Sequence, residues 1–133
     1  MVSDKFQVRS TGPVNSLTKQ PIKGRKAGGG VRFGEMERDS LLAHGVAYLL
    51  RDRLHLSSDA HTSHVCETCG SLVSSIIRAS FAETLKTAPS IEHCQVCRDG
   101  GHKEAINIPY VFKYLVAELA AMNIKIQVQI TRG

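Results

Sequence analysis

Four cysteines are the residues whose type and spacing best indicate chemistry in this chain. They form two pairs, Cys66-Glu-Thr-Cys69 and Cys94-Gln-Val-Cys97, with 24 residues between the pairs. Two thiolates three positions apart can be brought onto one ion by a tight turn, and two such turns supply the tetrahedral four-sulfur site that Zn²⁺ accepts. Sulfur then fills every coordination position and leaves none for a reactive water. We therefore expect zinc that holds structure.

The spacing alone leaves other roles for the cysteines open. A disulfide requires an oxidising compartment, but no secretory signal is evident near the N-terminus, and no apolar run approaches the roughly 18 residues of a membrane span. A redox CxxC of the thioredoxin type is expected within a βαβ pattern, which surrounds neither pair. His64 and His93 lie beside the pairs and are alternative ligands.

A second group of candidate residues lies in a glycine-rich loop near the N-terminus. The loop carries four cations around its glycines: Lys23, Arg25, Lys26 and Arg32. Residues 1–32 have a net charge of +6, whereas the remainder of the chain has −1. Neutralising phosphates releases counterions and gives sequence-independent affinity, so this loop suits a nucleic-acid backbone. A solvated connector is the alternative interpretation.

Catalytic groups are not predicted. His44 has no evident nucleophile or carboxylate partner. Glu35 and Glu37 are better explained as charges in the first turn of a helix, where its partial positive end stabilises them. We expect no catalytic residue and no activity of the chain alone.

The elements that position these residues follow from the hydrophobic pattern. Residues 1–34 are expected to form an extended arm, with room for one short strand over Phe6 to Arg9. From Glu35 to Leu54, apolar residues recur at the spacing of one amphipathic helix. Gly45 inside it costs about 1 kcal/mol relative to alanine and suggests close packing.

A boundary is expected between His55 and Thr62, where turn-forming residues interrupt the pattern. The cysteine unit that follows contains a strand-like run, Leu72 to Ile77, and a loose stretch from Ala79 to Ser90.

The C-terminal segment is predicted to be a helix followed by a strand. Pro109 is expected to begin the helix, which runs to Met122 with Asn123 as its C-cap. Apolar and polar residues then alternate strictly over residues 124–130, which predicts a half-buried strand.

Several strings resemble the second-largest subunits of multisubunit DNA-dependent RNA polymerases. GGVRFGEMERD at residues 29–39, followed by SLLAHG, closely resembles a signature block near the C-terminus of that family. KFQVRSTG at 5–12 and LTKQPIKGR at 17–25 resemble the segment upstream, and IPYVFKYLVAELAAMNI at 108–124 resembles the terminal helix. The pair Phe6-Gln7 and the ending VAELAAMNIKI are most similar to the RNA polymerase I version. The chain is identified as the C-terminal portion of such a subunit.

The resemblance implies an α+β fold in three parts. Residues 1–34 end a hybrid-binding region with a switch-like basic loop, and residues 35–56 form an anchor helix. Residues 57–133 form a clamp-type, zinc-ribbon-like unit with a terminal helix and strand. The family has a four-cysteine zinc site, and the resemblance implies that its ligands in this chain are Cys66, Cys69, Cys94 and Cys97.

The resemblance also implies a role inside a nucleotidyltransferase that transcribes ribosomal RNA in the nucleus, in the nucleolus. Its partners are the largest subunit, which holds the catalytic Mg²⁺ and on which the zinc unit packs, the other polymerase subunits, template DNA and the RNA–DNA hybrid. The expected nucleic-acid contacts are all the cations of the arm: Lys5, Arg9, Lys19, Lys23, Arg25, Lys26 and Arg32. The alternative function is a free-standing zinc-ribbon protein that binds nucleic acid through this arm.

Overall fold

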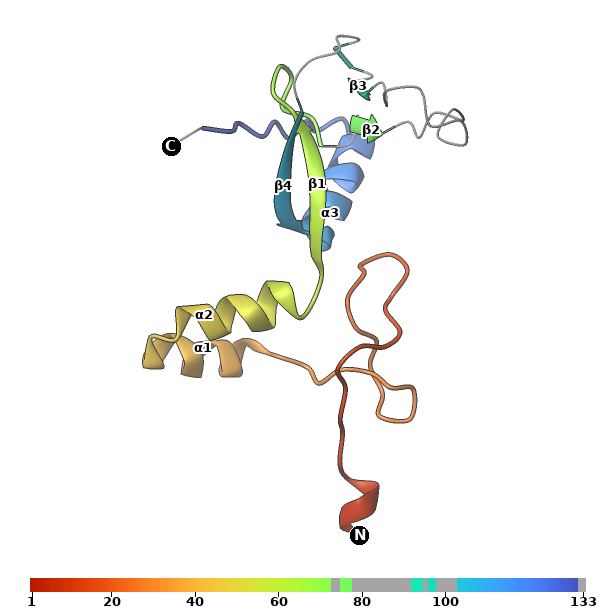
Figure 1. Cartoon of the computed structure of the whole chain (residues 1–133), viewed down its shortest axis with the longest axis vertical. Helices are drawn as coiled ribbons and strands as arrows, with labels where there is room; N and C mark the ends of the chain where they lie inside the picture. Colours follow the sequence, from red (N-terminus) through yellow and green to blue (C-terminus); the bar gives the residue numbers. More distant parts are fainter. Residues whose placement is uncertain (73–74, 78–91, 95, 98–102, 132–133) are drawn as a thin grey trace, which may run out of the picture. The chain divides into compact units, whose positions relative to one another are not determined.

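The computed structural model describes residues 1–72, 75–77, 92–94, 96–97 and 103–131 (Figure 1). The chain divides into two compact units. The first comprises Met1–His61 with Pro109–Val111, and the second comprises Thr62–Ile108 with Phe112–Gly133. No helix within the described ranges is long and apolar enough to cross a membrane.

The first unit begins with a 3₁₀ turn, η1 (Val2–Asp4), and continues as a looped arm to residue 34. Two isolated bridges, Val14 with Pro21 and Lys23 with Gly30, are its only β pairings among the described residues. The predicted strand over Phe6 to Arg9 is wrong. This segment is held to the loop by side chains, because Gln7 and Arg9 donate hydrogen bonds to loop carbonyls.

Two short helices follow the arm, α1 (Glu35–His44) and α2 (Ala47–Arg51), and the chain then makes a π-helical turn, η2 (Asp52–Leu56). The N-cap of the first helix is Gly34, whose N–H donates a hydrogen bond to the Glu37 carboxylate at 3.0 Å. Acidic residues occupy its first turn as predicted. None of the residues in α1, α2 and η2 is buried.

The single helix predicted over this region is interrupted at Gly45. The backbone there has φ +70°, and Gly45 N–H and Val46 N–H donate to the carbonyls of Leu42 and Leu41, as in a Schellman motif. A Cβ at Gly45 would have no atom within 4 Å. The glycine therefore marks a left-handed turn, and the expectation of close packing is wrong.

The described residues of the second unit form two small sheets and a helix (Figure 1). Strand β1 (Ala60–Cys66) pairs with β4 (Lys103–Pro109). Strand β2 (Ser75–Ile77), within the predicted strand-like run, pairs antiparallel with β3 (Glu92–Cys94). The predicted loose stretch from Ala79 to Ser90 lies outside the described residues. The mixed α and β composition is confirmed.

An aliphatic core joins these elements. Its buried residues are Val65, Leu72 and Val116. Val116 comes from α3 (Tyr110–Ala121), the predicted second helix, which starts one residue later than expected because Pro109 ends β4. The predicted cap is confirmed, since Asn123 has φ +62° and its N–H donates to the Ala120 carbonyl at 3.1 Å.

The segment after α3 is not a strand in the structure, so that prediction is wrong. Its alternation is nevertheless real, because the even-numbered residues Ile126, Val128 and Ile130 are half-buried and pack against the core. Val128 N–H donates to the Gly70 carbonyl at 2.9 Å. The segment thus packs against a turn rather than along the edge of a sheet.

Candidate metal centre and cationic hollow

The four cysteine sulfurs converge at one point of the second unit. All four Sγ atoms lie within 4.8 Å of one another. Cys66 Sγ is 3.9 Å from Cys97 Sγ, and Cys69 Sγ is 3.5 Å from Cys94 Sγ. Zn–S bonds of about 2.3 Å in a tetrahedron place sulfurs about 3.8 Å apart. The spacing therefore fits a tetrahedral metal centre, and it exceeds the ~2.05 Å of a disulfide bond.

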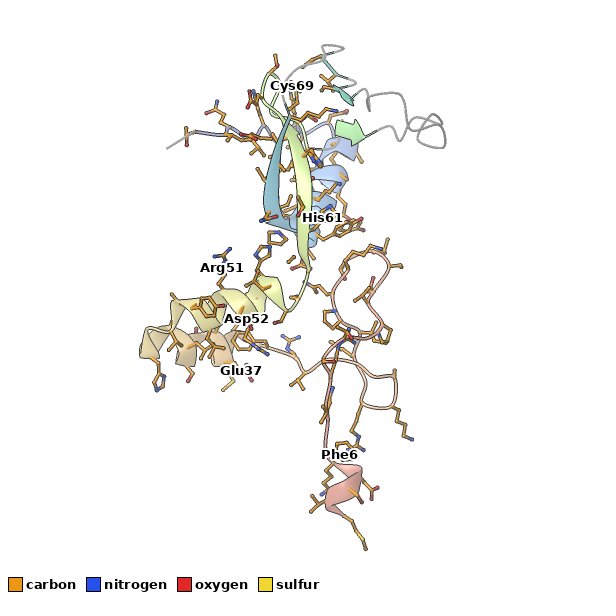
Figure 2. All side chains as sticks on the ribbon, in the orientation of Figure 1. Phe6, Glu37, Arg51, Asp52, His61 and Cys69 are labelled. Atoms are coloured by element: carbon orange, nitrogen blue, oxygen red, sulfur yellow. The ribbon has the colours of Figure 1, made fainter. Side chains whose placement is uncertain are left out.

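Two strand ends and a tight turn position the cysteine ligands. Cys66 ends β1, and Cys94 ends β3, where it pairs with Ser75 of β2. The turn after Cys66 closes when Gly70 N–H donates to the Cys66 carbonyl at 2.8 Å. Figure 2 shows Cys69 at the end of the unit that carries β2 and β3.

Gly70 is required in this turn for two reasons. Its φ of +64° lies in the left-handed region, where side chains other than hydrogen are strained. A Cβ at Gly70 would also stand 2.5 Å from Gln127 Cγ and 2.6 Å from the Val128 carbonyl oxygen. The turn therefore packs directly against the C-terminal segment.

The pKa values of three of these thiols are shifted, and not all in the same direction. The backbone N–H of Cys69 lowers the pKa of Cys66 by stabilising its thiolate. Burial raises the pKa of Cys69. Hydrogen bonding to Cys69, together with burial, raises the pKa of Cys97 to about 12. A bound metal ion would favour the thiolate form of the cysteine ligands, because metal binding replaces the protons of thiol ligands.

The alternative histidine ligands are not part of the described cluster. His64 lies outside the group of sulfurs that could share an ion. The side chain of His93 lies outside the described residues. Far from the cysteines in sequence, His44 is exposed on α1, with Nδ1 2.8 Å from the Ser40 carbonyl.

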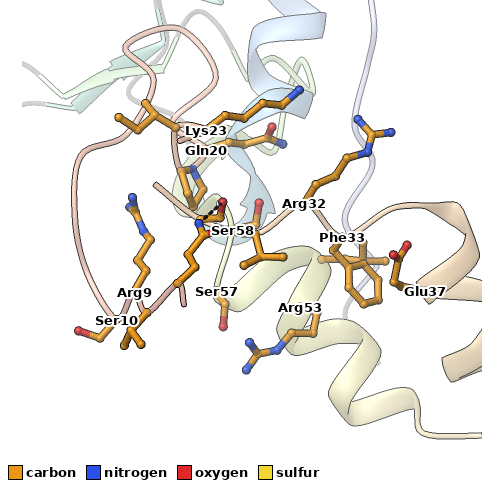
Figure 3. A pocket seen from close by; sticks show the side chains of 17 residues that line it. Arg9, Ser10, Gln20, Lys23, Arg32, Phe33, Glu37, Arg53, Ser57 and Ser58 are labelled. Atoms are coloured by element: carbon orange, nitrogen blue, oxygen red, sulfur yellow. Dashed lines mark hydrogen bonds between the residues drawn. The ribbon is translucent and has the colours of Figure 1, made fainter. Parts of the chain in front are cut away.

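The predicted arm cations fall into three sets in the first unit. Arg9, Lys23 and Arg32 line an open hollow of about 1130 Å³ (Figure 3). Arg25 and Lys26 line a smaller hollow of about 320 Å³. Lys5 and Lys19 are exposed and belong to neither, and Lys19 Nζ lies 5.9 Å from the centre of the Tyr110 ring.

Arg9 is half-buried, and its bonds hold the glycine-rich loop in shape. Arg9 Nη1 donates to the carbonyls of Pro13 at 2.9 Å and Gly28 at 2.8 Å. Gln7 Nε2 donates to the carbonyls of Gly29 at 2.8 Å and Gly30 at 2.9 Å. The sequence did not indicate this role of Gln7, because an amide carries no charge signal. Together the two side chains fix the backbone that presents the loop cations.

The larger space, here called the cationic hollow, is defined by its charged lining residues. These are Arg9, Lys23, Arg32, Arg53 and Glu37. Four cations thus face one carboxylate, which is already bonded to the Gly34 N–H. Arg53 comes from η2, a part of the chain with no excess positive charge, and it was missed for that reason. Such a surface attracts an extended anion.

Comparison with known proteins connects both sites to one kind of protein. Residues 29–131 match the family model described as RNA polymerase Rpb2, domain 7, and residues 1–27 match RNA polymerase Rpb2, domain 6. Over 98% of its length the chain is 55% identical to DNA-directed RNA polymerase I subunit 2 of Arabidopsis thaliana. It is 49% identical to DNA-directed RNA polymerase I subunit RPA2 of Homo sapiens, again over 98% of its length. The chain spans 12% of each of these relatives.

Proposed function

The chain belongs to the RNA polymerase Rpb2 family, and on that premise we propose that it serves as the C-terminal segment of the second subunit of RNA polymerase I. In this role it holds template DNA beside the RNA–DNA hybrid and packs on the largest subunit. The observation that carries the proposal is the match itself, because polymerase models cover the cationic arm and the cysteine unit together.

The arm supplies the nucleic-acid contact in this proposal. Lys23 and Arg32 present cations around one hollow, on an arm whose glycine-rich loop is held in shape by hydrogen bonds from Gln7 and Arg9. Contacts from such side chains go to phosphates and carry no sequence information. A polymerase that must move along every template needs such sequence-independent contacts.

The cysteine unit supplies stability. Cys66, Cys69, Cys94 and Cys97 would hold Zn²⁺, and their spacing supports that assignment. Zinc bound by four sulfurs contributes folding free energy and has no open position for a substrate. The aliphatic core is small in the described part of the unit, where three buried hydrophobic residues form its central cluster. A metal crosslink therefore matters for its stability.

In this proposal the zinc unit packs on the largest subunit, and the helical segment adds an exposed apolar surface to that docking. Met36 on α1 is 84% exposed and Tyr48 on α2 is 80% exposed, and no residue of either helix is buried. Burial of such exposed apolar side chains by a partner is favourable.

The chain contributes to nucleotidyl transfer by holding the template, and the largest subunit holds the Mg²⁺. It acts in the nucleus, in the nucleolus.

Co-purification tests the docking part of this proposal. The tagged 133-residue chain, loaded with zinc, is mixed with the N-terminal region of an RNA polymerase I largest subunit. We expect stable association together with one zinc per chain. A double variant, Met36→Asp with Tyr48→Asp, should abolish association and keep the zinc. Zinc without any association of the unaltered chain would contradict the docking role and favour an independent nucleic-acid-binding zinc protein.

A further inference from the structure

We propose that Arg53 of η2 is a further phosphate contact, so that the helical segment forms a second wall of the nucleic-acid site. This inference rests on the proposed function of the arm and extends it to a residue outside the arm. The sequence places Arg53 in a region whose acidic and basic residues nearly cancel. Only the fold brings it to the cationic hollow.

Separate parts of the first unit line the hollow (Figure 3). Arg9, Lys23 and Arg32 come from the arm, whereas Arg53, Ser57 and Ser58 come from η2 and the turn after it. A serine hydroxyl can donate a hydrogen bond to a phosphate oxygen, and Ser58 is placed for this. Cations from the arm and from η2 can therefore contact one backbone.

The ion pair between Arg53 and Asp52 leaves the Arg53 side chain accessible to a phosphate. Arg53 Nη2 lies 2.8 Å from Asp52 Oδ2, and the Arg53 side chain remains 53% exposed. Ser57 Oγ donates to the same Asp52 oxygen at 3.2 Å. Asp52 therefore restrains both groups beside the hollow. An exposed pair of this kind contributes little to stability, so a phosphate can compete with Asp52 for the guanidinium.

Charge arithmetic favours a polyanion as the occupant. Four cations and one carboxylate line the hollow. The carboxylate, Glu37, is the residue that accepts from the Gly34 N–H at the start of α1. A small anion would not need a hollow of about 1130 Å³, whereas a strand with several phosphates can contact all four cations in it.

Nearby residues provide matched controls for the test. Arg51 has the same charge, lies two positions earlier on α2 and is absent from the lining of the hollow (Figure 2). Arg51→Ala therefore removes an equal charge without removing the proposed contact. Asp52→Asn removes the competing carboxylate and keeps an oxygen that can accept from Ser57.

The experiment measures the affinity of the zinc-loaded 133-residue chain for a fluorescent RNA–DNA hybrid with a single-stranded DNA tail, over a series of salt concentrations. Arg53→Ala should weaken binding roughly two- to fivefold and lower the slope of log K against log salt by about 1. Arg51→Ala should leave the slope unchanged, and Asp52→Asn should tighten binding. Zinc content and circular dichroism confirm that each variant is folded.

The outcomes separate this inference from the function on which it rests. If Arg32→Ala weakens binding but Arg53→Ala matches the unaltered chain, the arm binds nucleic acid and the second wall is wrong. Equal losses for Arg51→Ala and Arg53→Ala would reduce the effect to general charge and overturn the inference as well. Failure of the unaltered folded chain to bind the hybrid would overturn both proposals.

Discussion

Asp59 Oδ2 accepts a hydrogen bond at 3.1 Å from the backbone N–H of Val111, which lies 52 positions later in the chain. The Asp59 carbonyl also accepts from the Tyr110 N–H at 2.9 Å. Helix α3 follows Pro109, which has no side-chain acceptor for the free N–H groups of the first turn. Asp59 therefore acts as the cap of a helix that is remote in sequence, and its carboxylate lies where the helix dipole favours negative charge.

Loss of this cap should destabilise the chain. Asp59→Ala removes the acceptor for Val111 and should lower the free energy of unfolding by about 1 to 2 kcal/mol, the range for lost caps. Asp59→Asn keeps an oxygen acceptor and should lose less. Urea denaturation of the zinc-loaded variants measures the difference. Equal stability of the alanine variant and the unaltered chain would show that the cap contributes nothing.

Two glycines with the same backbone conformation should respond differently to alanine. Gly45 has φ +70° with open space around it, whereas Gly70 has φ +64° and abuts Gln127 and Val128. Gly45→Ala should cost only the conformational strain, about 1 to 2 kcal/mol. Gly70→Ala adds a steric clash beside Cys69 and should also weaken zinc binding. Competition with a chromophoric chelator measures this, and unchanged zinc affinity of Gly70→Ala would argue against the turn geometry.

The cysteine cluster could be predicted almost completely, because two thiolates three positions apart can be brought onto one ion by a tight turn, and the chain has two such pairs. The conformation of the segment after α3 could not, and the strand predicted there is wrong. A period of two in Ile126 and Val128 shows which side chains turn inward but not whether a strand edge lies beside them. Strand β4 was missed because only Ile106 and Ile108 carry its alternation.

The broken helix shows a second limit of sequence reasoning. Apolar spacing continues through Gly45, so periodicity alone predicts one helix, while the left-handed backbone that ends α1 leaves no trace in that pattern. Arg53 of η2 lines the same hollow as arm residues that are distant from it in sequence. Contacts of that kind are tertiary and have no short-range signal.

The metal-free chain should lose stability in alkali. The pKa of the Cys97 thiol is raised from 9.0 to about 12, so the folded state holds this proton more tightly than the unfolded state does. That contribution is complete below pH 9 and is lost as the pH rises toward 12. Cys97→Ser should flatten this part of the stability profile in chelator-treated protein. Identical profiles for the serine variant and the unaltered chain would remove Cys97 as the cause.

Loop shape and loop charge should separate in binding experiments. Gln7 holds the glycine run without contributing charge, whereas Arg32 contributes charge to the cationic hollow. Gln7→Ala should weaken hybrid binding with the salt slope unchanged, because only the ordering of the loop is lost. Arg32→Ala should weaken binding and lower the slope by about 1. A lowered slope in Gln7→Ala would contradict a role limited to loop shape.

Photo-crosslinking in a transcribing enzyme tests the central proposal most directly. RNA polymerase I that carries this segment in its second subunit is stalled on a template with a photoreactive nucleotide beside the hybrid, and crosslinked peptides are identified by mass spectrometry. We expect crosslinks within residues 23–32, with a smaller set at Arg53. Crosslinks confined to other parts of an actively transcribing enzyme would contradict the assignment of this chain to template binding.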